Sequence, residues 1–335
     1  MINPSIIQLN RKSQKNGIYE SYYYRGNHED GNSAFWLKHN LLMFAGDCNV
    51  RVQSTLITFD KNKDHSETFN HMEVISLDEY LDRFSENKKS WNEFEYEFRN
   101  GSKMKVSSEV LKGELILPKE EKISWNLSLK PSNETYYHFS NNWFYHGFFP
   151  KKKILTKDIS LKFTGQLSVP RGDMEGTFLG INGHNWGKEH AYKYAYGNCN
   201  QFQEDSDAYF DGFSAKISLA KGLIKSPYLS GASLKFGGQW YHFNNVLTSY
   251  KHCVQNLLEK KWQITFVNKD YLLEANIIGN DEIWAHLNYD HPSGKVSTVH
   301  NTKFAKGTLI LKSQKDKEII KVLRSNFFEL ESLIP

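Results

Sequence analysis

Hydrophobic and polar residues alternate in many short segments of the chain. Phe94, Tyr96 and Phe98 alternate with charged residues, and the segment 122–130 repeats the pattern. Successive side chains of a strand point to opposite faces, so the pattern predicts strands that bury one face and wet the other. Many short strands of this kind favour barrels or sandwiches over a parallel α/β sheet. The sequence therefore predicts an all-β fold of antiparallel strands.

Turn residues between the alternating segments place two hairpins. Asn100-Gly101 follows the strand at 94–98 and predicts a type I′ turn. Glu29-Asp30-Gly31 predicts a second hairpin, which joins residues 18–25 to residues 34–44. Further strands are expected at residues 50–59, 159–169, 208–219, 233–236, 262–268, 271–278, 308–311 and 319–323.

One segment has helical spacing instead. Ser76 and Glu79 form a capping box at its start. The apolar residues that follow recur at helical spacing, at Leu77, Tyr80, Leu81 and Phe84. We therefore predict a helix within residues 76–90 and little helix elsewhere, although the segment 250–259 fits either a helix or a strand.

The length of the chain predicts two domains, because one β barrel or sandwich rarely needs 335 residues. Length and a dense polar motif place the boundary near residue 190, which divides the chain into domains at 1–190 and 191–335. The apolar residues include 22 Phe, 18 Tyr and 8 Trp against only 5 Met. Tyr and Trp suit the wall of a cavity, because each joins an apolar body to one polar tip.

Charge and cysteine content exclude several classes of function. The 42 basic and 38 acidic residues nearly balance, which argues against a nucleic-acid partner. The densest basic run, Lys151-Lys152-Lys153, is interpreted as a solvated turn after Pro150. The three cysteines lack CxxC spacing, so neither a disulfide framework nor a zinc knuckle is expected.

The sequence contains no recognisable signal peptide and no apolar run of membrane-spanning length. We therefore expect a cytoplasmic protein without an integral membrane segment. No P-loop, dinucleotide fingerprint or Ser-His-Asp elbow is present, so no cofactor is expected. A homodimer and a monomer are both compatible with the sequence.

The most unusual polar chemistry lies in Gly183-His184-Asn185-Trp186-Gly187. The glycines permit tight backbone, His184 and Asn185 can donate or accept hydrogen bonds, and Trp186 adds a large apolar face. This cluster forms either part of a ligand site or a hydrogen-bonded corner that holds two sheets together. No metal site is expected, because His184 and His190 lack a third nearby ligand and HExxH spacing.

Aromatic residues follow this cluster at strand spacing. Tyr192, Tyr194 and Tyr196 would share one face of a strand, and Asn198 would continue it. That face is either the wall of a ligand chamber or a packed ladder of aromatic rings.

Four pieces of the sequence occur in an order and at distances that resemble the AttH-like, or hydroxyneurosporene-synthase-like, family. They are Tyr19-Glu20-Ser21-Tyr22-Tyr23, Ala34-Phe35-Trp36-Leu37-Lys38, Gly183-His184-Asn185-Trp186-Gly187 and Tyr194-Ala195-Tyr196-Gly197. Wider relatives of this family include tocopherol cyclases and fungal decalin-forming pericyclases. The resemblance implies two lipocalin-like antiparallel β-barrel or sandwich domains, with an apolar pocket in or between them.

The resemblance implies isoprenoid or polyene chemistry only for some branches of the family. The hydratase branch often carries Asp directly before the histidine of its motif, where this chain has Gly183. Many relatives also have Trp at the position of Tyr196. These differences argue against carotenoid hydration.

Asp211 follows Tyr209 in a carboxylate-Gly-apolar-Ser-Ala pattern that also resembles the family. Facing an apolar chamber, the carboxyl group would favour its protonated form and could donate a proton to an alkene. The aromatic faces of Trp186 and Tyr209 could stabilise the resulting cation. With His184, these residues form the predicted catalytic set, and the alternative for Asp211 is a turn aspartate beside Gly212.

Arg25, Trp36 and Lys38 lie on the hairpin predicted around Gly31. They either frame the mouth of the pocket and bind a polar ligand end, or they pair across strands on a wet face. The predicted ligand-binding residues are Arg25, Trp36, Lys38, Asn185, Tyr194, Tyr196 and Asn198.

Two functions follow from these features. The first is cofactor-independent cyclisation, hydration or isomerisation of an apolar isoprenoid-like or polyene-like molecule, in which the pocket folds the substrate. The second is non-catalytic carriage of a lipid or isoprenoid, since lipocalin-type barrels commonly hold one small ligand. A carboxylate facing the cavity would favour the enzyme. A protein-interaction scaffold is a third reading, which predicts a small or filled interior.

Overall fold

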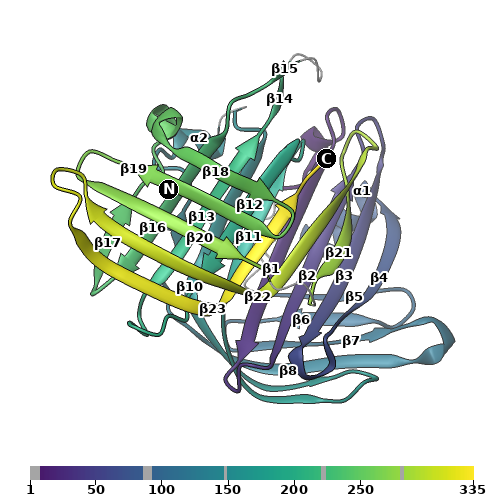
Figure 1. The fold of residues 1–335 in the computed structure, drawn as a ribbon. Coiled ribbons are helices and arrows are strands. Elements are labelled where there is room, and N and C mark those ends of the chain that lie inside the picture. The colour runs from purple at the N-terminus through teal and green to yellow at the C-terminus, as the bar shows by residue number, and fades with distance from the viewer. Residues whose placement is uncertain (1–7, 86–92, 147–148, 220–223, 280–282) are drawn as a thin grey trace.

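Two large antiparallel sheets make up the protein (Figure 1). The computed structural model describes residues 8–85, 93–146, 149–219, 224–279 and 283–335. The predicted all-β fold is confirmed, because strands dominate and the described helices are short. None of these helices is long and apolar enough to cross a membrane.

The first sheet has the order β4-β3-β2-β1-β11-β10-β8-β7-β6-β5, with β9 paired to β10. Its strands are β1 (Ile18–His28), β2 (Ser33–Met43), β3 (Asn49–Asp60), β4 (His65–Ser76), β5 (Phe94–Glu97), β6 (Lys103–Val106), β7 (Val110–Ile116), β8 (Lys122–Pro131), β9 (Tyr136–Tyr137), β10 (Lys152–Ser168) and β11 (Met174–Gly187).

The helices are α1 (Leu77–Ser85) and α2 (Trp143–His146), with 3₁₀ turns at Arg11–Ser13, Lys61–Lys63, Pro118–Glu120 and Val246–Lys251.

The second sheet has the order β17-β16-β13-β12-β23-β22-β20-β19-β18, with β21 paired to β22. Its strands are β12 (Lys193–Cys199), β13 (Tyr209–Lys216), β16 (Leu229–Phe236), β17 (Gln239–His242), β18 (Cys253–Leu258), β19 (Lys261–Val267), β20 (Tyr271–Ile278), β21 (Ala285–Asp290), β22 (Val296–Ser313) and β23 (Ile319–Leu333). The short strands β14 (Ser218–Leu219) and β15 (Ile224–Lys225) pair separately.

Each sheet curls, so that strands far apart in its order meet across a core. In the first sheet, the rings of His39 on β2 and Phe94 on β5 have centroids 5.2 Å apart. In the second sheet, the ring centroids of Phe210 on β13 and Phe266 on β19 lie 6.5 Å apart. The indole N–H of Trp262 on β19 donates to the hydroxyl of Ser214 on β13 at 3.1 Å. Each sheet therefore encloses an apolar core of its own.

The central strands are buried on both faces, because the two sheets also pack against each other. On β2, Phe35 and Leu37 enter the core of the first sheet, and Trp36 joins a cluster shared with the second sheet. Tyr209 of β13 and Phe304 of β22 belong to the same shared cluster. The faces expected to be wet on these strands are therefore covered by the other sheet.

The first hairpin is confirmed, since β1 pairs with β2 and Arg25 lies opposite Trp36. The hairpin after β5 is also present, but its turn is not type I′ because Gly101 alone has a positive φ, of 84°. The backbone N–H of Phe98 donates to the carbonyl of Ser102 at 2.8 Å, so three residues, not two, connect the paired ends.

The predicted helix is confirmed as α1, where the backbone N–H of Glu79 donates to the hydroxyl of Ser76 at 3.1 Å. Positions 86–90 of the prediction lie outside the described residues. The ambiguous segment 250–259 begins in a 3₁₀ turn and continues as β18. Among the described strands, the sequence missed β4, β7, β9, β11, β15, β17 and β21. It also missed the start of β10 before residue 159, the start of β22 before residue 308 and the end of β23 after residue 323.

The chain passes from the first sheet to the second in one short connection. β11 ends at Gly187 and β12 begins at Lys193, which brackets the predicted boundary at residue 190. That residues 1–190 and 191–335 fold as separate domains stays a prediction.

Stability should fall in mild acid because the core of the first sheet holds a neutral histidine. Burial lowers the pKa of His39 to about 3, and its Nδ1 lies 2.9 Å from the hydroxyl of Ser54. Below about pH 6.5, His39 becomes protonated in the unfolded chain but stays neutral in the folded protein. Stability present at neutral pH is therefore lost as the pH falls. In His39→Asn, the free energy of unfolding should fall less steeply with pH, by up to about 1.4 kcal/mol per pH unit. Urea unfolding between roughly pH 6.5 and 4.5 measures the slope.

His146→Asn is the matched control, because His146 is exposed. Its slope should equal that of the unaltered protein. An unchanged slope in His39→Asn would show that His39 does not account for the acid sensitivity.

Candidate functional site

A cavity of about 740 Å³ lies between the facing sides of the two sheets. Its wall combines residues of β1 and β2 in the first sheet with residues of β12, β13, β21 and β23 in the second. The exposed residues Met72 and Lys151 also belong to the wall, so the cavity reaches the surface. Its volume falls within the range of about 300–1,000 Å³ that small-molecule sites occupy.

Five of the predicted ligand-binding residues line this cavity: Trp36, Lys38, Asn185, Tyr194 and Tyr196. Strand alternation explains two pairs among them, Trp36 with Lys38 and Tyr194 with Tyr196, because residues two positions apart in a strand share a face. The predicted tyrosine face is shorter than expected, since Tyr192 precedes β12 and is 39% exposed.

The carboxylate of Glu331 is the polar centre of the wall. The hydroxyl of Tyr194 donates to it at 2.5 Å, and the hydroxyl of Tyr289 donates at 3.1 Å. Nδ2 of Asn301 donates a third hydrogen bond at 3.1 Å. Nζ of Lys38 donates to the Tyr289 hydroxyl at 2.9 Å. Lys38, Tyr289 and Glu331 thus form one continuous chain of hydrogen bonds.

Lys38 is held between aromatic rings. Its Nζ lies 4.4 Å from the ring centroid of Trp36 and 4.3 Å from that of Tyr289. Burial lowers the pKa of Lys38 to about 8, an effect that Glu331 opposes and the charge of Lys303 reinforces. A substantial fraction of Lys38 is therefore a neutral amine in mildly alkaline solution.

Lys152 and His190 complete the polar wall. Burial lowers the pKa of Lys152, whose Nζ lies 4.8 Å from the ring centroid of Tyr194. His190 stacks on Tyr19 at 3.9 Å, and burial together with the charge of Lys152 holds the pKa of His190 well below its ordinary value. The solvated-turn interpretation of Lys151-Lys152-Lys153 is wrong, because β10 begins at Lys152 and Lys153 is buried.

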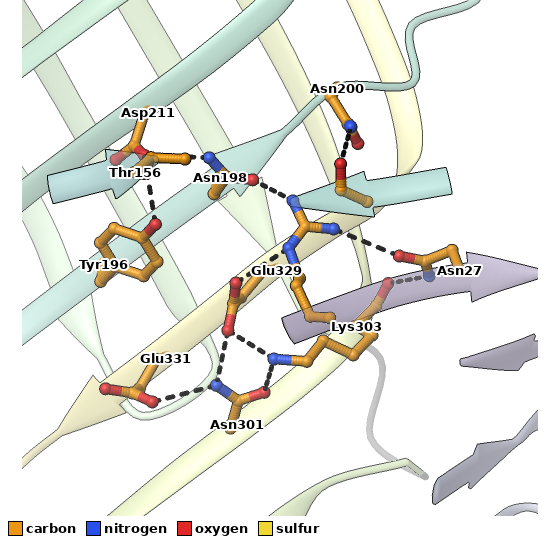
Figure 2. Close-up of polar contacts among 12 residues, drawn as sticks. Asn27, Thr156, Tyr196, Asn198, Asn200, Asp211, Asn301, Lys303, Glu329 and Glu331 are labelled. Atoms are coloured by element: carbon orange, nitrogen blue, oxygen red, sulfur yellow. Dashed lines mark hydrogen bonds and ion pairs between the residues drawn. The ribbon is translucent and has the colours of Figure 1, made fainter. Parts of the chain in front are cut away.

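Beside the cavity, a buried network of charges joins the two sheets, and its central residue Glu329 also belongs to the wall (Figure 2). Nε of Arg25 on β1 lies 3.1 Å from Oε2 of Glu329 on β23. Lys303 of β22 pairs with the same carboxylate, and Asn301 donates to it at 3.1 Å. Burial raises the pKa of Glu329, but Lys303 and Arg25 outweigh burial and hold it below its ordinary value. Arg25 also donates to Asn198 of β12. Arg25 and Asn198, both predicted to bind ligand, do not line the cavity.

Asp211 lies in the same buried layer and is surrounded by donors (Figure 2). Its Oδ2 accepts hydrogen bonds from Thr156 at 2.8 Å, Tyr209 at 2.6 Å, Asn198 at 3.0 Å and Tyr196 at 3.2 Å. Nε2 of His138 lies 2.7 Å from Oδ1. Asp211 and Tyr209 are not part of the cavity wall, whereas Tyr196 is. The predicted acid role of Asp211 stays a prediction, and these contacts present its carboxylate as an acceptor.

His184 and Trp186 are buried but do not line the cavity. Nε2 of His184 lies 2.8 Å from Oε1 of Glu20, and Trp186 stacks on His184 at 4.5 Å. The Glu20 carboxylate also accepts two backbone N–H groups, from Gln8 at 2.8 Å and from Leu9 at 2.9 Å. This geometry favours a hydrogen-bonded structural role for both residues, although within the first sheet and not between two sheets, while Asn185 between them reaches the cavity.

Several cavity residues were missed from the sequence: Glu331, Tyr289, His190 and Lys152. Glu329 and Glu331 alternate with Phe328 and Leu330, a period-two signal beyond the strand predicted at 319–323. That signal would locate the strand. It would not identify a site, because such a face is usually wet.

Among the described residues, no group of three or more His, Cys, Asp and Glu side chains is arranged to hold a metal ion.

The sequence matches no family model and no curated protein. The fold is similar to a Nitrosomonas europaea protein assigned as an AttH, with a TM-score of 0.54, 9% identity, and coverage of 99% of this chain and 98% of that one. It is also similar to CghA, alone and with Sch210972, each with a TM-score of 0.55, 8% identity, and coverage of 99% and 94%. At these identities the likeness shows the fold alone, so the chain has the AttH-like, lipocalin-like β fold.

The buried network predicts a large loss of stability in Glu329→Leu. This change leaves Arg25 and Lys303 without their carboxylate inside the protein. Removing one partner of a buried ion pair typically costs roughly 3–5 kcal/mol. Urea unfolding at neutral pH measures the change in the free energy of unfolding.

Glu204→Leu is the matched control, because Glu204 pairs with Arg324 at 2.9 Å on the surface. Its loss should stay below about 1 kcal/mol. Equal losses in the two variants would contradict a special role for the buried network.

Proposed function

We propose that this protein binds an apolar, isoprenoid-like or polyene-like molecule in the cavity between its sheets and promotes its cofactor-independent cyclisation, hydration or isomerisation. The observation that carries the proposal is a cavity of about 740 Å³ whose wall surface is more apolar than polar, with many aromatic rings and with charged groups that gather around Lys38 and Glu331. Apolar walls with a few placed polar groups are typical of small-molecule sites.

The chemistry proposed is the folding of one molecule into a reactive shape. Holding reacting parts of one substrate in near-attack geometry supplies ~7–11 kcal/mol in the best cases. The aromatic faces of Trp36, Tyr23 and Tyr196 stabilise positive charge that develops on the ligand. The cluster of Lys38, Tyr289 and Glu331 fixes a polar end of the ligand at one side.

The residues behind the wall enter the proposal as positioning residues. The hydroxyl of Tyr196, itself a wall residue, donates to Asp211 at 3.2 Å, which anchors its ring at the cavity wall. Tyr209, Asn198 and Arg25 hold Asp211 and the adjoining strands in register. Direct proton transfer from Asp211 is not part of this mechanism.

The structure of CghA with Sch210972 supports binding of a small molecule by this fold. A carrier is the second candidate. It is favoured by the saturated hydrogen bonding of Asp211, because a carrier needs no available acid. The scaffold reading fits less well, since it predicts a filled interior.

Mass spectrometry of apolar molecules that co-purify with the protein tests the proposal directly. The identified molecule is then incubated with the protein and extracted. Conversion supports the enzyme, recovery of unchanged ligand supports the carrier, and no bound apolar molecule under gentle purification counts against both.

Filling the cavity should abolish binding without removing a polar group. Ala215 of β13 lines the wall and pairs in register with Tyr194 of the neighbouring strand β12. Ala215→Trp therefore places an indole in the ligand volume. We expect the affinity for 1-anilinonaphthalene-8-sulfonate, measured by fluorescence titration, to fall by about tenfold or more, which corresponds to about 1.4 kcal/mol. Ile278→Trp, at an exposed residue of β20, is the control and should bind like the unaltered protein. Equal affinity in all three proteins would place the bound probe outside the cavity.

A further inference from the structure

Lys38 has surroundings that neither simple ligand folding nor carriage requires. It is 6% exposed and lies on the cavity wall, against two aromatic rings and one hydroxyl. Among the described residues, no carboxylate forms a direct ion pair with it. Lys303 differs, because it pairs with Glu329 and lies outside the wall.

These surroundings favour a neutral amine. A lysine becomes nucleophilic when it is desolvated in an apolar pocket or placed beside other cations, and Lys38 meets both conditions. Burial lowers its pKa to about 8, with the charges of Lys303 and Lys152 acting in the same direction and Glu331 opposing them. The electrophile that a buried neutral amine meets on an otherwise apolar ligand is a carbonyl carbon.

We propose that Lys38 forms a Schiff base with an apolar aldehyde or ketone bound in the cavity. The inference rests on the proposed function, because it places the carbonyl ligand in the same cavity. Nζ attacks the carbonyl carbon and forms a C–N bond, while the carbonyl π electrons move to oxygen, which takes up a proton. Loss of that oxygen as water leaves a C=N bond, so one amine and one carbonyl give one imine and one water.

The hydrogen-bond chain of the wall carries the proton. Nζ of Lys38 donates to Tyr289 at 2.9 Å, and Tyr289 donates to Glu331 at 3.1 Å. The proton lost by the attacking nitrogen passes to the Tyr289 oxygen as the Tyr289 proton passes to Glu331. The reverse transfer delivers that proton to the carbonyl-derived oxygen and gives a hydroxyl. The hydroxyl leaves as water with a second proton, supplied by solvent at the open side of the cavity, while the nitrogen keeps its remaining proton, so the product is a protonated imine. A protonated imine then withdraws electrons from a conjugated chain, which lowers the barrier to rotation or ring closure along it.

Reductive trapping of the full-length protein tests this step. The probe is all-trans-retinal, an apolar polyene aldehyde, with sodium cyanoborohydride to reduce the imine to a stable secondary amine. Intact mass and peptide mapping locate the adduct. We expect one retinyl group on Lys38, its loss in Lys38→Arg, and its retention in Lys152→Arg, which alters a second lysine of the cavity wall. Lys38→Met is a second variant, and circular dichroism checks that each variant is folded.

Retinol, which has the same apolar body without the carbonyl, separates the inference from the proposed function. Retinol binding with an adduct confined to Lys38 supports both. Retinol binding without an adduct on Lys38, or with labelling spread over surface lysines, overturns the Schiff base and leaves the proposed function standing. Failure of both retinoids and of 1-anilinonaphthalene-8-sulfonate to bind would overturn the proposed function itself.

The pH dependence adds an independent measure. The groups that face Lys38 are Tyr289 of β21, Glu329 and Glu331 of β23, Lys303 of β22, Lys152 of β10 and His190 of the connection between the sheets. Between roughly pH 6 and 9, labelling of Lys38 should rise through its pKa of about 8, ahead of ordinary lysines, which titrate near 10.4. A profile that follows surface lysines contradicts the assignment.

Discussion

The ion pair between Arg25 and Glu329 is the interaction on which the rest of the structure depends. Arg25 belongs to the first sheet and Glu329 to the second, and both side chains are almost fully buried. A charge placed inside a protein without a partner is strongly unfavourable. The first sheet can therefore bury Arg25 only when the second sheet supplies Glu329 as its counter-charge, so the pair specifies how the sheets face each other.

The site follows from this pairing through strand alternation. Arg25 and Tyr23 share a face of β1, and Glu329 and Glu331 share a face of β23. When Arg25 and Glu329 meet in the buried layer, Tyr23 and Glu331 therefore lie at the cavity wall. The burial that makes the cavity apolar also lowers the pKa of Lys38 to about 8, so the fold and the reactivity of the wall have one cause.

Much of the fold was predictable from local pattern, whereas the polar centre of the site was not. The first hairpin and α1 depend on alternation, turn residues and a cap, which act between near neighbours. The faces of β1 and β2 were expected to be wet or to frame a pocket, and only the second sheet decides between these. Glu331 and Tyr289 gain their roles from pairing across more than forty positions, at a distance that alternation does not encode. The His184 motif likewise gains its role from a distant partner, because His184 meets Glu20 on β1, 164 positions away in the chain.

The chemistry of Lys38 also restricts the ligand. A ligand carboxylate beside Nζ would favour the ammonium form, because a nearby opposite charge stabilises the charged state of a lysine. The same contact would hold the amine proton and remove its nucleophilicity. Lys38 can therefore serve as an anchor for an acid or as a nucleophile for a neutral carbonyl, but not as both for one ligand. Glu331 already supplies negative charge through Tyr289. A second carboxylate would therefore add like-charge repulsion within an apolar cavity, so a neutral carbonyl fits this wall better than an acid does.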